Sequence, residues 1–208
     1  MITTLILDMG NVLLEWNPIK YIGVFEHNKK RGKKIYQAVF ESGIWAKQDS
    51  GEYTILEAIT ESLKLLDLTY KEAIDNLYNC WFLYTESYKE FQDHVIYLNS
   101  CGYKVYILSN TSDVYYKIEK VGLLPITSII SDKVLSFEVK KMKPNIDIYQ
   151  VLLEKYDLSP KECLFLDDIE QNVEAAESLG IKGLVVGESR MITKNLEHIL
   201  NCLGAYPI

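Results

Sequence analysis

Five short runs rich in aliphatic residues divide the chain, and polar or turn-forming residues follow each of them. The runs lie at residues 5–7, 103–108, 126–131, 163–166 and 183–186. Apolar runs of this length indicate strands buried on both faces, as in a parallel sheet covered by helices. Between the later runs, apolar residues recur every three or four positions, which predicts amphipathic helices. Strands that alternate with helices predict an α/β fold with a doubly wound, five-stranded parallel sheet.

Residues 16–87 differ from the rest because their apolar periodicity is helical throughout. Asn17, followed by proline, has the form of a helix start, and residues 54–57 and 69–72 both have the form of a capping box. Residues 29–34 are basic, and we expect them to form an exposed turn between two helices. The stretch predicts a bundle of roughly four helices inserted between the first two strands.

This insertion gives the chain two expected units. With 208 residues the chain can bury one sizeable core. We expect residues 1–15 and 88–208 to form a catalytic core around the sheet, with a last helix at about residues 193–203. Residues 16–87 would form the separate helical unit.

Polar side chains follow three of the predicted strands. Asp8 ends the first run, Ser109 and Asn110 follow the second, and Asp167 and Asp168 follow the fourth. Because the carboxyl ends of parallel strands meet at one edge of the sheet, where open α/β sheets bind their ligands, we expect these side chains to lie close together. Helix capping could explain any one of them, but it explains the whole set, with its acidic pair, less well.

Composition narrows the classes of partner. The net charge of −7 argues against a general affinity for nucleic acids or anionic membranes, although a local cation could still hold a small anionic substrate. No apolar run is long enough to cross a bilayer, and the N-terminus shows no export signal, so we expect a cytoplasmic protein. The four cysteines are scattered, which fits reduced thiols better than disulfides or a zinc site. No sequence feature indicates the oligomeric state.

Four separated segments, in order, resemble the haloacid dehalogenase-like superfamily of phosphotransferases. They are Asp8-Met9-Gly10-Asn11-Val12, Leu108-Ser109-Asn110, Lys143-Pro144, and Phe165-Leu166-Asp167-Asp168 with Asn172 four residues on. Each segment alone is a weak signal, but the ordered set is specific. The resemblance implies a Rossmann-like core, with the helical insertion as the small α-helical cap of one branch. Within that branch the first and fourth segments are similar to those of α-D-glucose 1-phosphate phosphatase.

The resemblance also implies a role for each residue. Asp8 would attack phosphorus and form an aspartyl-phosphate, while Lys143 would neutralise charge beside it. Ser109 and the main-chain N–H of Asn110 would hold phosphoryl oxygens. The metal ligands would be Asp8, the Gly10 carbonyl and Asp168, with Asp167 or Asn172 acting directly or through water, and this all-oxygen set points to Mg²⁺. A solvated basic loop at residues 140–143 is the alternative for the lysine.

Gly10 departs from the pattern of many phosphatases of this superfamily, which place a second aspartate two residues after the nucleophile. No carboxylate on that turn can protonate the leaving oxygen, a contribution usually worth ~10²–10⁴-fold. The sequence therefore indicates slow turnover or a leaving group that needs little protonation, such as the anomeric oxygen of a sugar phosphate. We expect a small phosphorylated metabolite, with a sugar phosphate favoured.

Two other functions stay open from the sequence. A hydrolytic 2-haloacid dehalogenase would also lack the second aspartate, but it would need an arginine near Asp8, and Arg31 lies in the basic stretch of the insertion. A non-catalytic module that binds Mg²⁺ and a phosphorylated ligand is the other possibility. Residues of the insertion that could contact the substrate are Trp16, Trp45, Gln48, Tyr53 and Trp81.

Overall fold

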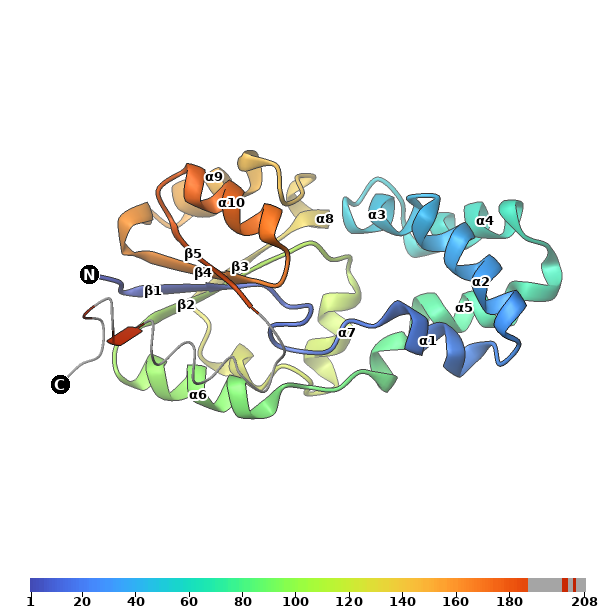
Figure 1. Cartoon of the computed structure of the whole chain (residues 1–208), viewed down its shortest axis with the longest axis horizontal. Coiled ribbons are helices and arrows are strands. Elements are labelled where there is room, and N and C mark those ends of the chain that lie inside the picture. The colour runs from blue at the N-terminus through green and yellow to red at the C-terminus, as the bar shows by residue number, and fades with distance from the viewer. Residues whose placement is uncertain (187–199, 202–203, 205–208) are drawn as a thin grey trace.

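The computed structural model describes residues 1–186, 200, 201 and 204, which form an α/β lobe and a helical lobe side by side (Figure 1). All strand pairings in the α/β lobe are parallel, and the order is β3-β2-β1-β4-β5. The strands are β1 (Thr4–Leu7), β2 (Lys104–Ser109), β3 (Asp132–Leu135), β4 (Cys163–Asp167) and β5 (Lys182–Val185). The predicted doubly wound, five-stranded Rossmann-like sheet is thus confirmed.

Helices cover both faces of this sheet, as Figure 1 shows. They are α6 (Lys89–Ser100) and α7 (Val114–Lys120) on one face, and α9 (Ile146–Lys155) and α10 (Glu170–Ser178) on the other. Alternate residues of β1 divide between two cores: Leu5 and Leu7 pack with α6 and α7, whereas Ile6 packs with α9 and α10. Because both faces are buried, the strands read as continuous apolar runs in the sequence.

β1 lies between β2 and β4, so its carboxyl end has a neighbouring strand on both sides. Leu7 pairs with Ile107 of β2 and with Leu166 of β4. Continued by one residue, this register places Asp8 level with Asp167. The chain runs from β1 to β2 and β3 on one side and reaches β4 and β5 on the other, so the edge beside β1 is the topological switch point of the sheet.

The helical lobe fills the chain between β1 and α6. Its helices are α1 (Pro18–Phe25), α2 (Lys29–Tyr36), α3 (Ile44–Asp49), α4 (Ile55–Leu65) and α5 (Lys71–Cys80), with a π-helical turn at Gln37–Glu41 and 3-10 turns at Leu68–Tyr70 and Trp81–Tyr84. Asn17 caps α1, and Thr54 with Glu57 makes the predicted capping box of α4. The two connections to the α/β lobe run together, since Glu15 N donates to Glu86 O (2.8 Å).

Two local predictions in this lobe are wrong. The basic residues 29–34 form helix α2 rather than a turn, because Asn28 caps their free N–H groups and Gly32 lets α2 approach Ile22 of α1. Residues 69–72 form no capping box. Asp67 instead accepts from Thr69 N and caps a 3-10 turn, and α5 starts at Lys71 without a side-chain cap.

The third strand is also displaced from its prediction. Residues 126–131 were expected to be extended, but Pro125 begins a 3-10 turn (Pro125–Ser128), and β3 starts only at Asp132. Ile126 is fully buried in the core that contains α6 and α7. Its apolar character therefore reflects its burial in this core and does not indicate a strand. Short helix α8 (Ser136–Val139) follows β3, and a 3-10 turn (Pro160–Glu162) precedes β4. Of the helix predicted at 193–203, only residues 200 and 201 are described, and they are helical; the rest lies outside the described residues.

Within the described part of the chain, no helix combines the length and the apolar character that a membrane span requires.

Candidate active site

Asp8 lies directly after β1, and its carboxylate is buried at the carboxyl edge of the sheet. Its main-chain N–H donates to Leu166 O (2.9 Å), which extends the pairing with β4 by one residue. Burial raises the pKa of Asp8 to about 6; the Lys143 ammonium opposes this rise, and the charge of Asp167 adds to it. Asp8 is therefore a carboxylate held in a site that disfavours its charge.

Lys143 is the cation of the site. Its buried Nζ lies 2.7 Å from Asp8 Oδ1 and donates to Asp167 Oδ2 at 2.6 Å. Burial by itself lowers the pKa of Lys143, but the two carboxylates outweigh it, so the pKa is raised and the side chain stays charged. The solvated-loop alternative is wrong for this residue, since only 4% of Lys143 is exposed.

The main chain of Lys143 is held by Asn110. Asn110 Nδ2 donates to Lys143 O, and Lys143 N donates to Asn110 Oδ1, both at 2.9 Å. The amide therefore ties the end of β2 to the loop that carries the lysine. This contact explains how a loop residue more than thirty positions along the chain is placed beside Asp8.

Three carboxylates face one another at this edge. One oxygen each from Asp8, Asp167 and Asp168 lies within 4.8 Å of the others. Asp167 Oδ1 accepts from Asn172 Nδ2 and from Ile169 N, both at 2.9 Å. Asp168 accepts from Asn11 Nδ2 at 2.9 Å, and burial raises its pKa. Three carboxylates with one ammonium leave excess negative charge in a set of oxygen donors, which fits a hard divalent cation.

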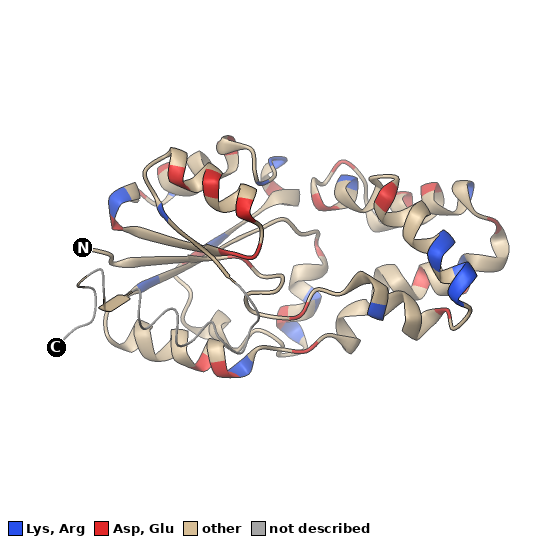
Figure 2. Cartoon of the chain, viewed as in Figure 1, with Lys and Arg blue, Asp and Glu red and all other residues tan. Residues whose placement is uncertain are grey.

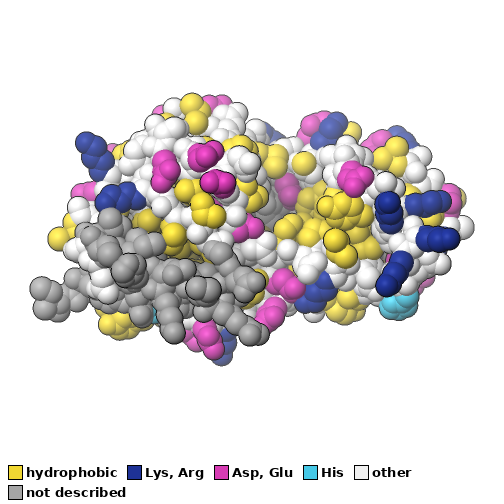
Figure 3. All heavy atoms as spheres, viewed as in Figure 1, with side chains coloured by type: hydrophobic (Ala, Val, Ile, Leu, Met, Phe, Trp, Pro, Cys, Tyr) yellow, Lys and Arg dark blue, Asp and Glu magenta, His cyan; other side chains and the backbone are white. Residues whose placement is uncertain are grey.

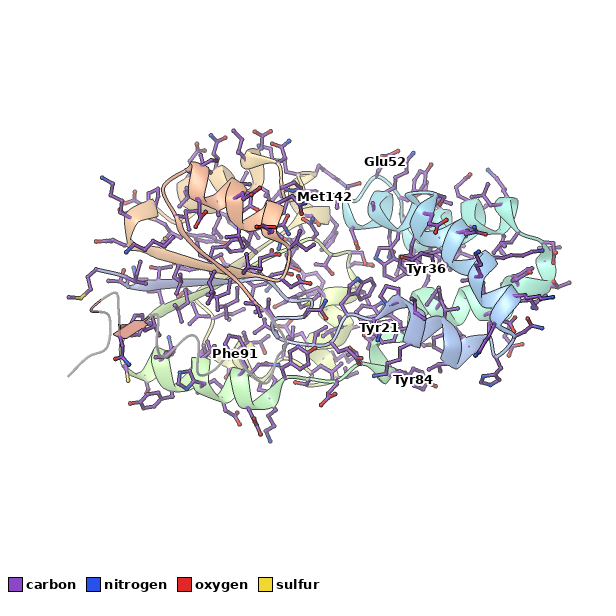
Figure 4. The ribbon with its side chains drawn as sticks, viewed as in Figure 1. Tyr21, Tyr36, Glu52, Tyr84, Phe91 and Met142 are labelled. Atoms are coloured by element: carbon purple, nitrogen blue, oxygen red, sulfur yellow. The ribbon has the colours of Figure 1, made fainter. Side chains whose placement is uncertain are left out.

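A cavity of about 290 Å³ opens onto these groups, between the two lobes. Residues of the α/β lobe that line it include Asp8, Gly10, Asn110, Thr111, Lys143, Asp168 and Asn172. Ser109 ends β2 and is buried, and Asn110 and Thr111 rather than Ser109 line the cavity. Asp167 is likewise buried behind the lining residues. Met142, labelled in Figure 4, lies on the side of the α/β lobe that faces α3 and also lines the cavity.

The helical lobe supplies an aromatic wall to this cavity. Trp16, Phe40, Trp45 and Trp81 line it. Their rings contact one another, with centroids 5.3 Å apart for Trp16 and Trp45 and 4.8 Å apart for Trp16 and Trp81. Figure 3 shows hydrophobic side chains gathered on the helical lobe beside the hollow between the lobes. Of the insertion residues considered as substrate contacts, the three tryptophans thus reach the cavity.

The other two insertion residues lie elsewhere. Gln48 is buried and donates through Nε2 to Ser112 Oγ (3.0 Å) on the α/β lobe, so it joins the lobes. Tyr53 packs against Lys47, whose Nζ lies 4.9 Å from the ring centroid. Neither residue lines the cavity.

Two residues near the site were missed from the sequence. Asn11, at φ 53°, points its amide to Asp168 and accepts from Trp16 N, so it joins the acidic pair to the turn after β1. Asp49, at the end of α3, lines the cavity from the helical lobe. Asn11 could have been found as part of the first motif, but no local sequence signal separates Asp49 from the other acidic residues of the insertion.

Arg31 lies far from Asp8. It pairs with Glu26 (Nε to Oε2, 2.5 Å) and donates through Nη2 to Thr69 O at 2.9 Å. Figure 2 shows the basic residues of α2 at the end of the helical lobe away from the sheet. Among residues 1–186, no arginine lines the cavity.

The chain is similar to several known proteins. Over 203 residues it is 25% identical to acyl-CoA dehydrogenase family member 10 of Mus musculus, and the aligned region covers 94% of this chain and 19% of the relative. It is 32% identical over 107 residues to phosphatase MT3486 of Mycobacterium tuberculosis, covering 50% of this chain and 48% of the relative. The chain therefore spans less than half the length of these curated relatives.

A solved structure is similar over nearly its whole length. The HAD family enzyme bt-2542 of Bacteroides thetaiotaomicron, in complex with magnesium and inorganic phosphate, is 25% identical with a TM-score of 0.72, covering 90% of this chain and 96% of that one. The family described as haloacid dehalogenase-like hydrolase matches residues 2–180. The resemblance seen in the four motifs is therefore confirmed, and the chain belongs to the haloacid dehalogenase-like hydrolase family.

Proposed function

We propose that this chain is a Mg²⁺-dependent phosphatase that hydrolyses a small phosphorylated metabolite through an aspartyl-phosphate on Asp8. The observation that carries the proposal is the meeting of Asp8, Lys143 and Asp168 at one cavity, with Asp167 buried behind them. These residues are far apart in the sequence, since Asp8 follows β1, Lys143 lies in a loop, and the acidic pair stands at the end of β4. Phosphoryl transfer needs an in-line nucleophile and neutralisation of charge, and these groups supply both.

The roles of the protein's own groups follow from their positions. Asp8 attacks phosphorus, and the Lys143 ammonium beside it offsets the negative charge of the phosphoryl group. Asn110 keeps the lysine in place, and its main-chain N–H would hold a phosphoryl oxygen, whereas Ser109 is buried outside the cavity lining and is not assigned this role. Water then hydrolyses the aspartyl-phosphate and restores Asp8.

The acidic cluster would hold the metal ion. Its direct ligands would be Asp8, the Gly10 carbonyl and Asp168, while Asp167, held by Lys143, and Asn172 would act directly or through water. Bound Mg²⁺ supplies positive charge that neutralises the phosphate and these carboxylates. Support comes from bt-2542, which binds magnesium and inorganic phosphate in its structure. The phosphatase named among the relatives supports the same reaction class.

We further propose that residues 16–87 act as a cap whose aromatic wall contacts the part of the substrate beyond the phosphate. Residues 1–15 and 88–208 would be the catalytic core. A sugar phosphate fits this wall because its ring offers C–H faces to aromatic side chains and hydroxyls to polar ones. The Trp81 indole N–H is buried without a partner among the described residues, so it is a donor available to such a hydroxyl.

A phosphatase screen with and without Mg²⁺, over sugar phosphates, nucleotides and phosphoamino acids, tests the proposal. We expect turnover that a chelator abolishes. Asp8→Asn should lose turnover but still bind phosphate, which calorimetry measures. Release of halide from a 2-haloacid without metal would instead indicate the dehalogenase. Binding of Mg²⁺ and phosphate by a parent protein with no turnover would indicate the non-catalytic module. Either result would overturn the proposed function.

A further inference from the structure

The turn after Asp8 carries no second carboxylate, but the cavity contains one from the opposite lobe. Gly10 occupies the position two residues after the nucleophile, and a Cβ there would lie 3.4 Å from Trp16 Cβ, in ordinary van der Waals contact. Asp49 lines the same cavity as Asp8, Gly10 and Lys143. A carboxyl-bearing residue of the helical lobe, the lobe proposed to contact the substrate beyond the phosphate, therefore lines the same cavity as the nucleophile.

The segment that carries Asp49 is held against the α/β lobe by its own main chain. Ser136 Oγ, fully buried at the start of α8, donates to Asp49 O (2.5 Å) and accepts from Thr111 N (2.9 Å). One residue earlier, Gln48 donates to Ser112 Oγ (3.0 Å), and two residues later Gly51 O accepts from Lys140 Nζ. None of these three contacts uses the Asp49 carboxyl group, and together they hold Asp49 at the cavity.

The surroundings of the Asp49 carboxyl group favour its protonated form. Burial raises its pKa well above the ordinary value, the negative charge of Asp8 raises it further, and a hydrogen bond from Trp45 works in the opposite direction. A carboxylic acid whose pKa is raised holds its proton to higher pH and can donate it to a leaving oxygen. This environment agrees with the position of the group in the cavity.

We propose that Asp49 is the general acid and base of the reaction, in the role that Gly10 leaves unfilled. In the first step Asp8 forms a bond to phosphorus, and the bond from phosphorus to the leaving oxygen breaks. That oxygen keeps the electron pair and takes the proton of Asp49, giving a neutral alcohol and an Asp49 carboxylate. In the second step water attacks phosphorus and gives a proton to Asp49, and the bond to Asp8 breaks with its electron pair returning to the Asp8 carboxylate. Inorganic phosphate leaves, and both residues are restored.

This assignment rests on the proposed phosphatase function and changes what it implies for the substrate. The preference for an anomeric sugar phosphate followed from the missing acid on the turn after Asp8. With Asp49 as the acid, a leaving group of ordinary basicity becomes acceptable. A sugar 6-phosphate is then as reasonable a substrate as a sugar 1-phosphate.

The test compares two aryl phosphates of similar shape, phenyl phosphate and p-nitrophenyl phosphate, in the parent, Asp49→Asn and Asp49→Glu. The nitrophenolate leaves without protonation, whereas the phenolate benefits from an acid. We expect Asp49→Asn to lose ~10²-fold or more of kcat/KM, which reports the first step alone, on phenyl phosphate and much less on p-nitrophenyl phosphate. Asp49→Glu should recover part of the loss on phenyl phosphate. Glu52→Gln is the matched control, because Glu52 is exposed, pairs with Lys47 and lies at the outer edge of the same segment (Figure 4).

An equal loss of kcat/KM on both substrates, or no loss on either, would overturn the role of Asp49 while the phosphatase function stands. If the parent turns over neither phosphate in the presence of Mg²⁺, or if Asp8→Asn stays fully active, the proposed function itself fails. The two failures are thus distinguished by the parent and the Asp8 variant.

Discussion

Single residues at the carboxyl edge of the sheet are placed by contacts that leave their reacting atoms available. Asn110 holds the main chain of Lys143 with both ends of its amide, and the lysine's Nζ remains free to contact Asp8 and Asp167. The position of the Lys143 ammonium therefore depends on the Asn110 side chain, which is neutral and adds no charge to the site. Replacing a residue that holds the site should therefore have a different effect from replacing one that reacts.

Replacing Asn110 with Ala should reduce activity more than stability. The change removes two hydrogen bonds, with an expected loss of about 1–3 kcal/mol in the free energy of unfolding. A displaced Lys143 should lower kcat by about 10²-fold. The main-chain N–H of residue 110 is retained, so the effect reports the side chain. Asn99→Ala, which removes one amide contact with Tyr103 O (2.9 Å) far from the cavity, is the control, and equal activity losses in both variants would contradict the prediction.

Asp49 should make the protein less stable as the pH rises. Its folded pKa is raised above the unfolded value, so the unfolded chain loses this proton first, and stability present below about pH 4 is lost as the pH climbs toward the folded pKa. Asp49→Asn lacks this titration. In the metal-free protein, the stability of Asp49→Asn relative to the parent should therefore grow from acid to neutral pH, by about 1.4 kcal/mol per pH unit at most.

Denaturant unfolding of both proteins between pH 4 and pH 8 measures this difference. The groups that face Asp49 across the cavity, Asp8, Asp168 and Lys143, are present in both proteins. A difference that stays constant with pH would show that the Asp49 carboxyl is ordinary.

At the scale of elements, the docking of α3 on α8 sets the relation between the lobes at the cavity. Gly51 adopts φ 68° there, and a Cβ would lie 2.5 Å from Phe137 O and 3.0 Å from Phe137 Cα. Since those atoms are main chain, the neighbour cannot move aside as a flexible side chain would. Glycine at this position is thus required by close approach as well as by its backbone conformation.

Gly51→Ala should therefore separate α3 from the α/β lobe. We expect kcat/KM to fall by about 10-fold to 100-fold because the wall of the cavity shifts. Gly43→Ala is a matched control, because Gly43 also has positive φ (82°) but a Cβ there meets no atom within 4 Å. Both variants share a backbone strain of about 1–2 kcal/mol. Similar activities in the two variants would show that the approach to Phe137 does not matter for function.

The elements were predicted well where burial and capping act locally. The apolar runs at β1, β2 and β4, the cap at Asn17 and the box at Thr54 depend on neighbours in the sequence, and the structure confirms them. The start of β3 was misplaced because Ile126 lies in a 3-10 turn that packs against α6, a contact that local patterns do not report. Asp49 was missed for the same reason, since only the docking of α3 brings it to the cavity.

At the scale of the whole molecule, negative charge is concentrated where the two lobes meet. The chain carries a net charge of −7, and three of its buried or half-buried carboxylates face one another around a single ammonium. The fold holds these groups together against their repulsion, and a divalent cation would relieve it. A ligand that binds the folded chain alone must also stabilise it.

We therefore expect Mg²⁺ to raise the melting temperature of the whole chain, measured by calorimetry without substrate. At a concentration of 100 times the dissociation constant, the stabilisation is about 2.7 kcal/mol, which corresponds to about 5–10 °C for a chain of this size. Asp168→Asn should lose this response and, because it removes one of the repelling charges, should be no less stable than the parent when metal is absent. Glu52→Gln, on the exposed outer edge of the helical lobe, should respond as the parent does. A melting temperature that Mg²⁺ leaves unchanged in the parent, or that it raises equally in Asp168→Asn, would place the cation away from the acidic cluster and remove the electrostatic basis of the proposed reaction.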